Sequence, residues 1–254
     1  MSHEIETMAY AGETPWHGLG NPVSNNMTPE EMLVAADLNW TVSKRQAYTL
    51  DNPNCLNLLD PRSEANFLRC DGNYFLTRDS DNKILSPCGE GYVPFQNHQV
   101  LDFFKKFTEA GNMQMETAGS LKAGKDIWGL AKLNQKYELA GNDEVGGYLL
   151  VNNSHTVGKA MTIMFTPIRV VCNNTLTLAL NQVGAKFRVV HLQMFDEEIK
   201  KAAEESLGLS GVQMTQFKEQ SEYLSSKKYK TGSLENFVAD LFQPTLLADR
   251  HKAL

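Results

Sequence analysis

Four side chains that could do chemistry lie close together in a segment that is otherwise apolar. Residues 161–180 contain Arg169, Cys172, Asn173 and Asn174. A guanidinium in an apolar strand must find a carboxylate, a phosphate or carbonyl oxygens, because an unpaired buried charge is costly. Arg169 is therefore expected either in a salt bridge inside the fold or in contact with the phosphate of a bound strand.

Cys172 allows two interpretations. A thiolate near a helix N-terminus is stabilised by the amide dipoles, so Cys172 could act as a nucleophile with His155 or His191 as its base. The alternative is a buried structural cysteine at the end of a strand, which the sequence favours. His17 and His98 stand alone, like the other two histidines, with no second ligand at a characteristic spacing. No phosphate-binding loop or hydrolase motif occurs either. We therefore expect that the protein is not an enzyme and that it has no metal site and no cofactor.

Lysines in two polar turns are the other candidates. Lys122 and Lys125 lie in one turn, and Lys159 lies in a second turn that begins at Asn152. Such turns can approach a phosphodiester backbone through exposed amides while their lysines neutralise it, although solvated turns have the same composition. The predicted nucleic-acid-binding residues are Lys122, Lys125, Lys159, Arg169, Lys186 and Arg188. The candidates for stacking on bases are Tyr92, Phe95, Trp128 and Tyr148, with core packing as the alternative for most of them.

The elements that must position these residues are predicted from hydrophobic periodicity and turn residues. A strand at 160–171 is expected to turn directly into a helix capped by residues 173–175. A further strand is predicted to begin at residue 40. The remaining predicted strands cover 67–69, 74–77, 83–85, 113–117, 126–133, 148–151 and 187–191. Helices are predicted at 32–38, with Thr28 as N-cap, and at 98–110, 196–207, 212–227 and 233–241.

This element order predicts an α+β fold. An antiparallel sheet of a meander and long hairpins is packed by helices, and a helical tail follows. The predicted organisation is an N-terminal arm at 1–27, a core domain at 28–208 and a helical C-terminal segment at 209–254. Within the arm, the loop Pro15–Gly20 is expected to pack Trp16 on the core and to place His17.

The composition is that of an ordinary globular protein. Of the 254 residues, 42% are hydrophobic and 21% are charged, and there is no apolar run long enough to span a membrane. The four cysteines are scattered, which suggests reduced thiols. The net charge of −6 is unevenly distributed: residues 117–194 carry 4 acidic and 8 basic side chains, whereas residues 1–116 carry 16 acidic and 8 basic ones. Only this middle third is cationic.

Several motifs together resemble the phage/plasmid-like family called domain of unknown function 932. The matching pieces are Pro15–Gly20, Glu116–Gly124, Asn153–His155 and Thr166–Leu176. The resemblance runs from residue 15 to about 192, and its last motif is quite specific. It implies occurrence in phages, prophages and plasmids, but no established reaction.

The order of elements also resembles the core of the single-strand annealing recombinases of phages. This resemblance implies rings or filaments that hold single-stranded DNA in a basic groove without consuming a nucleotide. We therefore expect a homo-oligomeric annealing protein for recombination or replication in the cytoplasm of an infected bacterial host, with a phage or host nuclease as a further partner. The alternative is an interaction protein that modulates a host enzyme or defence component.

Overall fold

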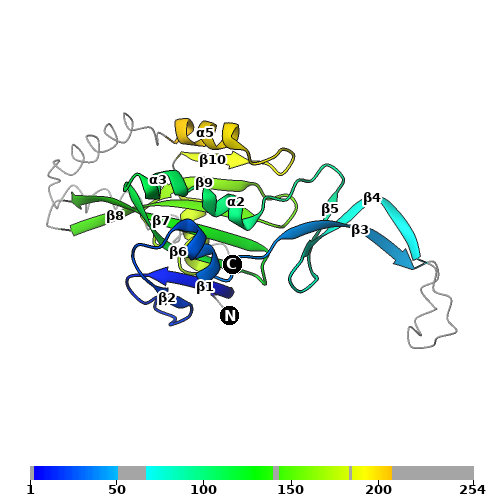
Figure 1. Ribbon diagram of the computed structural model, residues 1–254, viewed down its shortest axis with the longest axis horizontal. Coiled ribbons are helices and arrows are strands. Elements are labelled where there is room, and N and C mark those ends of the chain that lie inside the picture. Colours follow the sequence, from blue (N-terminus) through cyan, green and yellow to red (C-terminus); the bar gives the residue numbers. More distant parts are fainter. Residues whose placement is uncertain (1–2, 51–66, 140–142, 183–184, 208–254) are drawn as a thin grey trace, which may run out of the picture.

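The computed structural model describes residues 3–50, 67–139, 143–182 and 185–207, which form ten strands and five helices (Figure 1). The strands are β1 (Ile5–Ala11), β2 (Asn21–Val23), β3 (Val42–Leu50), β4 (Phe67–Arg78), β5 (Lys83–Gly89), β6 (Met113–Leu121), β7 (Asp126–Leu139), β8 (Asp143–Ser154), β9 (Met161–Thr166) and β10 (Lys186–Val189). The helices are α1 (Pro29–Ala35), α2 (Asn97–Asp102), α3 (Lys105–Glu109), α4 (Asn173–Asn181) and α5 (Glu197–Ser206).

Seven strands form a large sheet in the order β10-β9-β8-β7-β6-β1-β2. All neighbours pair antiparallel except β1 and β2, which are parallel. The predicted long hairpins are β6–β7 and β8–β9, joined by short turns. The α+β prediction is confirmed. The segment predicted as an N-terminal arm supplies β1 and β2 to this sheet.

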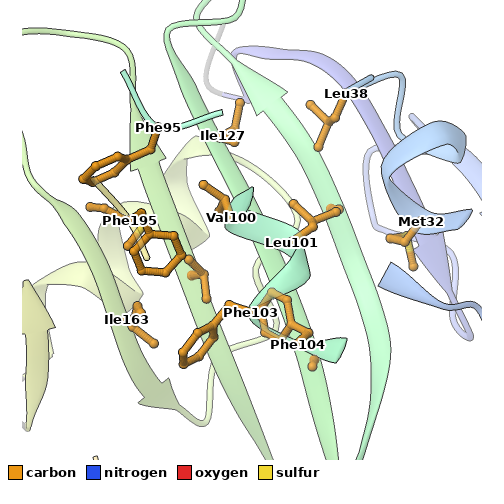
Figure 2. Close-up of a cluster of buried hydrophobic side chains, with 14 of the residues drawn as sticks. Met32, Leu38, Phe95, Val100, Leu101, Phe103, Phe104, Ile127, Ile163 and Phe195 are labelled. Carbon is orange, nitrogen blue, oxygen red and sulfur yellow. The ribbon is translucent and has the colours of Figure 1, made fainter. Parts of the chain in front are cut away.

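Both faces of the large sheet are buried. Along β7, Ile127 packs on one face with α1, α2, α3 and α5, whereas Trp128 packs on the other face with α4. This alternation follows from the two-residue repeat of a strand. Figure 2 shows Val100, Leu101 and Phe104 lying over the sheet on the first face. Strands covered on both sides bury apolar residues on both faces, which explains apolar segments such as Tyr148–Val151.

A small sheet of β3, β4 and β5 extends away from this body (Figure 1). A partly buried ion pair joins it to the large sheet, because both terminal nitrogens of Arg78 lie 3.0 Å from the carboxylate of Glu6 on β1. The same guanidinium binds Asp81 in the turn after β4. A bidentate guanidinium–carboxylate contact of this kind fixes orientation as well as distance.

The helix predicted at 98–110 is wrong in one respect, because the structure divides it into α2 and α3. The division falls at Phe103 and Phe104, which are 3% and 0% exposed. Neighbouring residues point about 100° apart around a regular helix. The interruption allows both rings to be buried, and burial of two aromatic side chains outweighs the few hydrogen bonds of a continuous short helix.

The prediction of two strands at 67–69 and 74–77 is also wrong, because β4 is continuous across them. The predicted turn residues form a bulge instead, located where the β3–β4 register shifts between Gln46 and Tyr48. Gly72 has φ 73° there, a conformation that favours glycine. The amide of Gln46 holds the bulge by donating to the carbonyls of Cys70 and Asn73.

The strand predicted at 160–171 ends at Thr166. Pro167 has no N–H for the ladder, and the hydroxyl of Thr166 accepts a hydrogen bond from the amide of Ile168, which turns the chain. Cys172 is the N-cap of α4, and the hydroxyl of Thr175 accepts from the amide of Cys172. The strand therefore does not run directly into the helix.

The predicted starts of two helices are confirmed. Thr28 forms a capping box with Glu31 at α1, and Asp196 caps α5. The helices predicted at 212–227 and 233–241 lie outside the described residues.

Candidate nucleic-acid interface

Two hairpin ends meet at one end of the large sheet. The β6–β7 turn and the β8–β9 turn lie side by side because Asp126, the first residue of β7, pairs with Ser154, the last residue of β8. The amide of His155 donates to the carbonyl of Lys125 at 2.7 Å, which extends the pairing into the turns. Lys122, Lys125 and Lys159 are thus brought to one place, and we call them the lysine cluster.

A buried carboxylate organises the lysine cluster. Lys159 Nζ lies 3.0 and 3.1 Å from the two oxygens of Asp126, and Lys122 Nζ lies 3.2 Å from one of them. Burial raises the pKa of Asp126, but hydrogen bonds from Ser154 and Lys159 and the charges of both lysines outweigh it and lower the pKa below its usual value. Lys122 also lies 4.0 Å from Glu4. Two of the three lysines are therefore partly neutralised.

Among the predicted cations, Lys125, Lys186 and Arg188 have no ion-pair partner within the described ranges. The side chains of Lys125 and Arg188 are exposed, whereas Lys186 is partly buried. Lys125 belongs to the lysine cluster, while Arg188 lies on the edge strand β10 opposite Thr162, near the start of β9. Arg188 is therefore on the same end of the sheet as the β8–β9 turn.

The turn that carries Lys122 has an unusual backbone. Lys122, Ala123 and Gly124 have φ values of 52°, 61° and 86°, so three successive residues are left-handed. The first two are strained for residues with a Cβ. A Cβ on Gly124 would lie 2.8 Å from Arg78, which accounts for the glycine. The motif around this turn thus has a structural role in joining the two sheets.

Gly119 and Ser120 of the same motif also serve packing. A Cβ on Gly119 would lie 2.4 Å from the ring of Trp128 and 2.5 Å from the carbonyl of Thr7. The hydroxyl of Ser120 hydrogen bonds to Glu6 at 2.9 Å. These contacts require the small residues irrespective of any ligand.

Arg169 and Lys186 are not brought to the lysine cluster. Arg169 Nε donates to Glu116, and its terminal nitrogens each donate at 2.8 Å to the carbonyls of Ala11 and Glu13. The internal salt bridge, the first of the two alternatives for this residue, is confirmed. Lys186 Nζ donates to the carbonyl of Leu180 at 2.6 Å.

The prediction that aromatic residues stack on bases is wrong for all four candidates. They are Tyr92, Phe95, Trp128 and Tyr148, and each is at most 9% exposed. All four rings belong to the two hydrophobic clusters on the faces of the large sheet. No face of these rings is open to a base, and the alternative of core packing is correct.

Cys172 and the two histidines proposed as its base lie on opposite faces of the large sheet. Cys172 is buried with α4, and its sulfur lies 3.5 Å from the hydroxyl of Thr175. His155 contacts Asn97 on the other face, and the ring of His191 stacks on Phe95 with centroids 4.3 Å apart. The arrangement does not form a nucleophile–base pair.

Both histidines support the segment that leads into α2. His191 Nδ1 lies 3.1 Å from the carbonyl of Val93, and His155 Nε2 lies 3.0 Å from Asn97 Oδ1. The amide nitrogen of Asn97 donates to the carbonyl of Leu38, so its oxygen faces His155 and accepts from it. His155 Nδ1 then carries a lone pair, and this buried atom has no hydrogen-bond partner. Burial, and secondarily the neighbouring His191, lowers the pKa of His155 to about 3.

The loop Pro15–Gly20 lies against the segment that precedes α4. His17 Nε2 donates to the carbonyl of Val171 at 3.0 Å, while its Nδ1 accepts from the amide of Leu19. His17 is thus placed as a structural residue. The expectation that Trp16 packs on the core is wrong, because Trp16 is 70% exposed. Sequence reasoning missed it as a candidate for stacking, since a tryptophan in a glycine-rich loop usually anchors that loop.

Neither a metal centre nor a membrane-spanning helix is found in the part of the chain that the structure describes. No three His, Cys, Asp or Glu side chains there are grouped to hold a metal ion. No helix there is long and apolar enough to cross a membrane.

One comparison with known proteins gives a match. Residues 84–253 match the model of the family described as Domain of unknown function (DUF932). No curated protein and no solved structure matches the chain. Because the family model covers about two thirds of the 254 residues, the chain belongs to this family.

Proposed function

Starting from this family membership, we propose that the protein binds single-stranded DNA and promotes strand annealing without a nucleotide cofactor. The observation that carries the proposal is the meeting of the two hairpin ends, which gathers Lys122 and Lys159 around a single buried carboxylate and places Lys125 in the same turn as Lys122. The cationic balance of residues 117–194 supports it. The proposed setting is recombination or replication in the cytoplasm of a phage-infected bacterium, with a phage or host nuclease as a further partner.

The chemistry of the lysine cluster suits a phosphodiester backbone. Each ammonium carries three N–H donors, and Lys159 uses two of them on the oxygens of Asp126, so a donor remains for a phosphate oxygen. Asp126 holds the ammonium groups in place, and Lys125 adds a charge with no ion-pair partner in the described part of the chain. Contacts to phosphate position a strand without reading its sequence, so we expect little sequence preference.

Fluorescence anisotropy of a labelled oligonucleotide at increasing salt tests the proposal. The logarithm of the binding constant should fall linearly with the logarithm of the salt concentration. Each phosphate contact contributes about 0.7 to the steepness of this line for a single strand. The variants Lys125→Ala and Lys159→Ala should each lower the slope and the affinity. Lys201→Ala is the matched control, because this lysine is 76% exposed and belongs to α5 and not to either turn. Absence of binding at micromolar protein and low salt would overturn the proposal.

Annealing adds a second requirement. Two complementary strands should pair faster in the presence of the protein, with no nucleotide added. Particle images should show rings or filaments that form or lengthen with the oligonucleotide. A monomer under both conditions would refute the oligomeric part of the proposal, while binding itself would stand.

A second candidate function is interaction with a host protein. It is favoured by Val190, Leu192 and Met194, which are 53%, 72% and 68% exposed in the connection between β10 and α5. Exposed apolar side chains at alternate positions beside an edge strand are a feature of binding surfaces. A host protein that is retained stoichiometrically after nuclease treatment, and is lost in Leu192→Asp, would favour this function over annealing.

A further inference from the structure

Trp16 is the most exposed of the three tryptophans. It is 70% exposed, whereas Trp40 is 9% and Trp128 is 0% exposed. A large ring left in water forgoes the stabilisation that burial would give, and tryptophan is therefore usually largely buried. Its exposure next to the buried Pro15 points to a contact made outside the chain.

The loop that carries Trp16 is held on both sides. The carbonyl of Pro15 accepts from the amide of Gly18 at 2.9 Å, and His17 is fixed by Val171 as described above. Arg169 fastens the preceding residues through the carbonyl of Glu13. At the end of the loop, a Cβ on Gly20 would lie 2.4 Å from Met8, so the backbone there is packed closely on β1. The ring is presented on an ordered backbone, which reduces the entropy lost on binding.

The surroundings of the ring favour a flat aromatic partner over a protein surface. The ring meets His17 edge to face, with centroids 5.2 Å apart and an interplanar angle of 70°. Its neighbours Thr14 and His17 are polar, Pro15 is buried, and Leu19 is the one other exposed large apolar side chain of the loop, at 39%. A protein hot spot requires a contiguous apolar centre that excludes water. A nucleobase requires only one accessible ring and tolerates a polar rim.

We propose that Trp16 is a base-stacking residue for an unpaired nucleobase, an inference that rests on the proposed single-strand binding. The strand β1 connects the two contact points. It begins at Ile5, opposite Leu121 beside the lysine cluster, and ends at Ala11 before the loop. Its 7 residues span roughly 20 Å. A bound strand would contact the lysine cluster through phosphates and place a base on Trp16.

Two strands of equal length and charge separate stacking from phosphate binding: a thymidine oligonucleotide and an abasic one. The thymidine strand should quench the exposed tryptophan fluorescence of the wild type, and the abasic strand should not. Trp16→Ala should lower the affinity for the thymidine strand by about 5- to 150-fold, the range expected from loss of one stacked base. The affinity of Trp16→Ala for the abasic strand should equal that of the wild type. The variant Trp16→Phe should recover most of the affinity for the thymidine strand. Val34→Ala on α1 is the control, since Val34 is likewise exposed, at 63%.

The outcomes distinguish this inference from the proposed function. Equal affinity of wild type and Trp16→Ala for the thymidine strand overturns the stacking role while single-strand binding stands. An equal loss of affinity for both strands overturns it too, because that pattern indicates a structural effect of the substitution. Absence of binding by the wild type removes the proposed function and the inference together. If Trp16→Ala instead dissociates an oligomer in sedimentation without affecting either strand, the ring belongs to a protein interface and the inference fails.

Discussion

The fold should lose stability in mild acid because His155 is buried in its neutral form. The residue is 0% exposed, and its pKa is lowered to about 3 from the ordinary value of 6.5. Between these two values the unfolded chain binds a proton that the folded chain does not. The free energy of unfolding therefore falls as the pH decreases from about 6.5 towards 3, by up to 1.36 kcal/mol per pH unit.

The variant His155→Gln isolates this contribution. Glutamine is uncharged and can still donate to Asn97 Oδ1, so it removes the titration while keeping the main contact. At neutral pH we expect the variant to be less stable than the wild type by about 1–3 kcal/mol, through imperfect packing and hydrogen bonding. Between pH 7.5 and pH 4.5 the wild type should lose about 2.7 kcal/mol more stability than the variant. The difference between the two proteins should therefore shrink by this amount and can change sign.

Urea unfolding at the two pH values measures the effect. Tryptophan fluorescence is a suitable signal, because the ring of Trp40 lies 5.4 Å from that of His155 between centroids. Comparing variant with wild type at each pH cancels the contributions of titrating groups that do not interact with His155. A difference between the two proteins that does not change with pH would refute the account of His155 as a neutral buried group.

Two further predictions concern glycines and the left-handed turn, and both are measured by urea unfolding. Gly119→Ala should destabilise the protein by at least about 2 kcal/mol, because the added Cβ meets a buried ring and a backbone carbonyl. Gly89→Ala, where no atom lies within 4 Å of the new Cβ, should change stability by less than about 0.5 kcal/mol, and equal effects of the two substitutions would contradict the packing argument. Ala123→Gly should stabilise by about 0.5–1 kcal/mol, because it relieves the strain of φ 61° at some cost in chain entropy, and a destabilisation would show that the turn is not strained.

Local patterns predicted the parts of the fold that depend on neighbours in the chain. The capping residue Thr28 was recognised because its partner lies three residues away. The hairpins of the large sheet followed from polar turns between apolar segments, and they placed the lysine cluster at two turns. The division of the helix at Phe103 was missed, because it depends on what the ring contacts across the sheet.

The candidate site was only partly predictable. The sequence marked Lys122 and Lys159 as cations in turns but did not reveal that Asp126 holds both of them. The motifs that resemble the family contain Trp16 and Arg169. They did not show that Arg169 holds the residues that precede the loop of Trp16. The two are 153 positions apart in the sequence, and no local pattern encodes a contact over that separation.

The sequence by itself determined the α+β class, the hairpins, the cap of α1 and the position of the basic turns, since these depend on periodicity and short-range hydrogen bonds. Only the tertiary structure decided which charged groups pair and which aromatic rings are covered. Ion pairing and burial are set by residues that folding brings together from distant parts of the chain. For that reason Arg169 has become an internal link and the predicted stacking rings are core residues, while Trp16, expected to be buried, is left exposed in the loop.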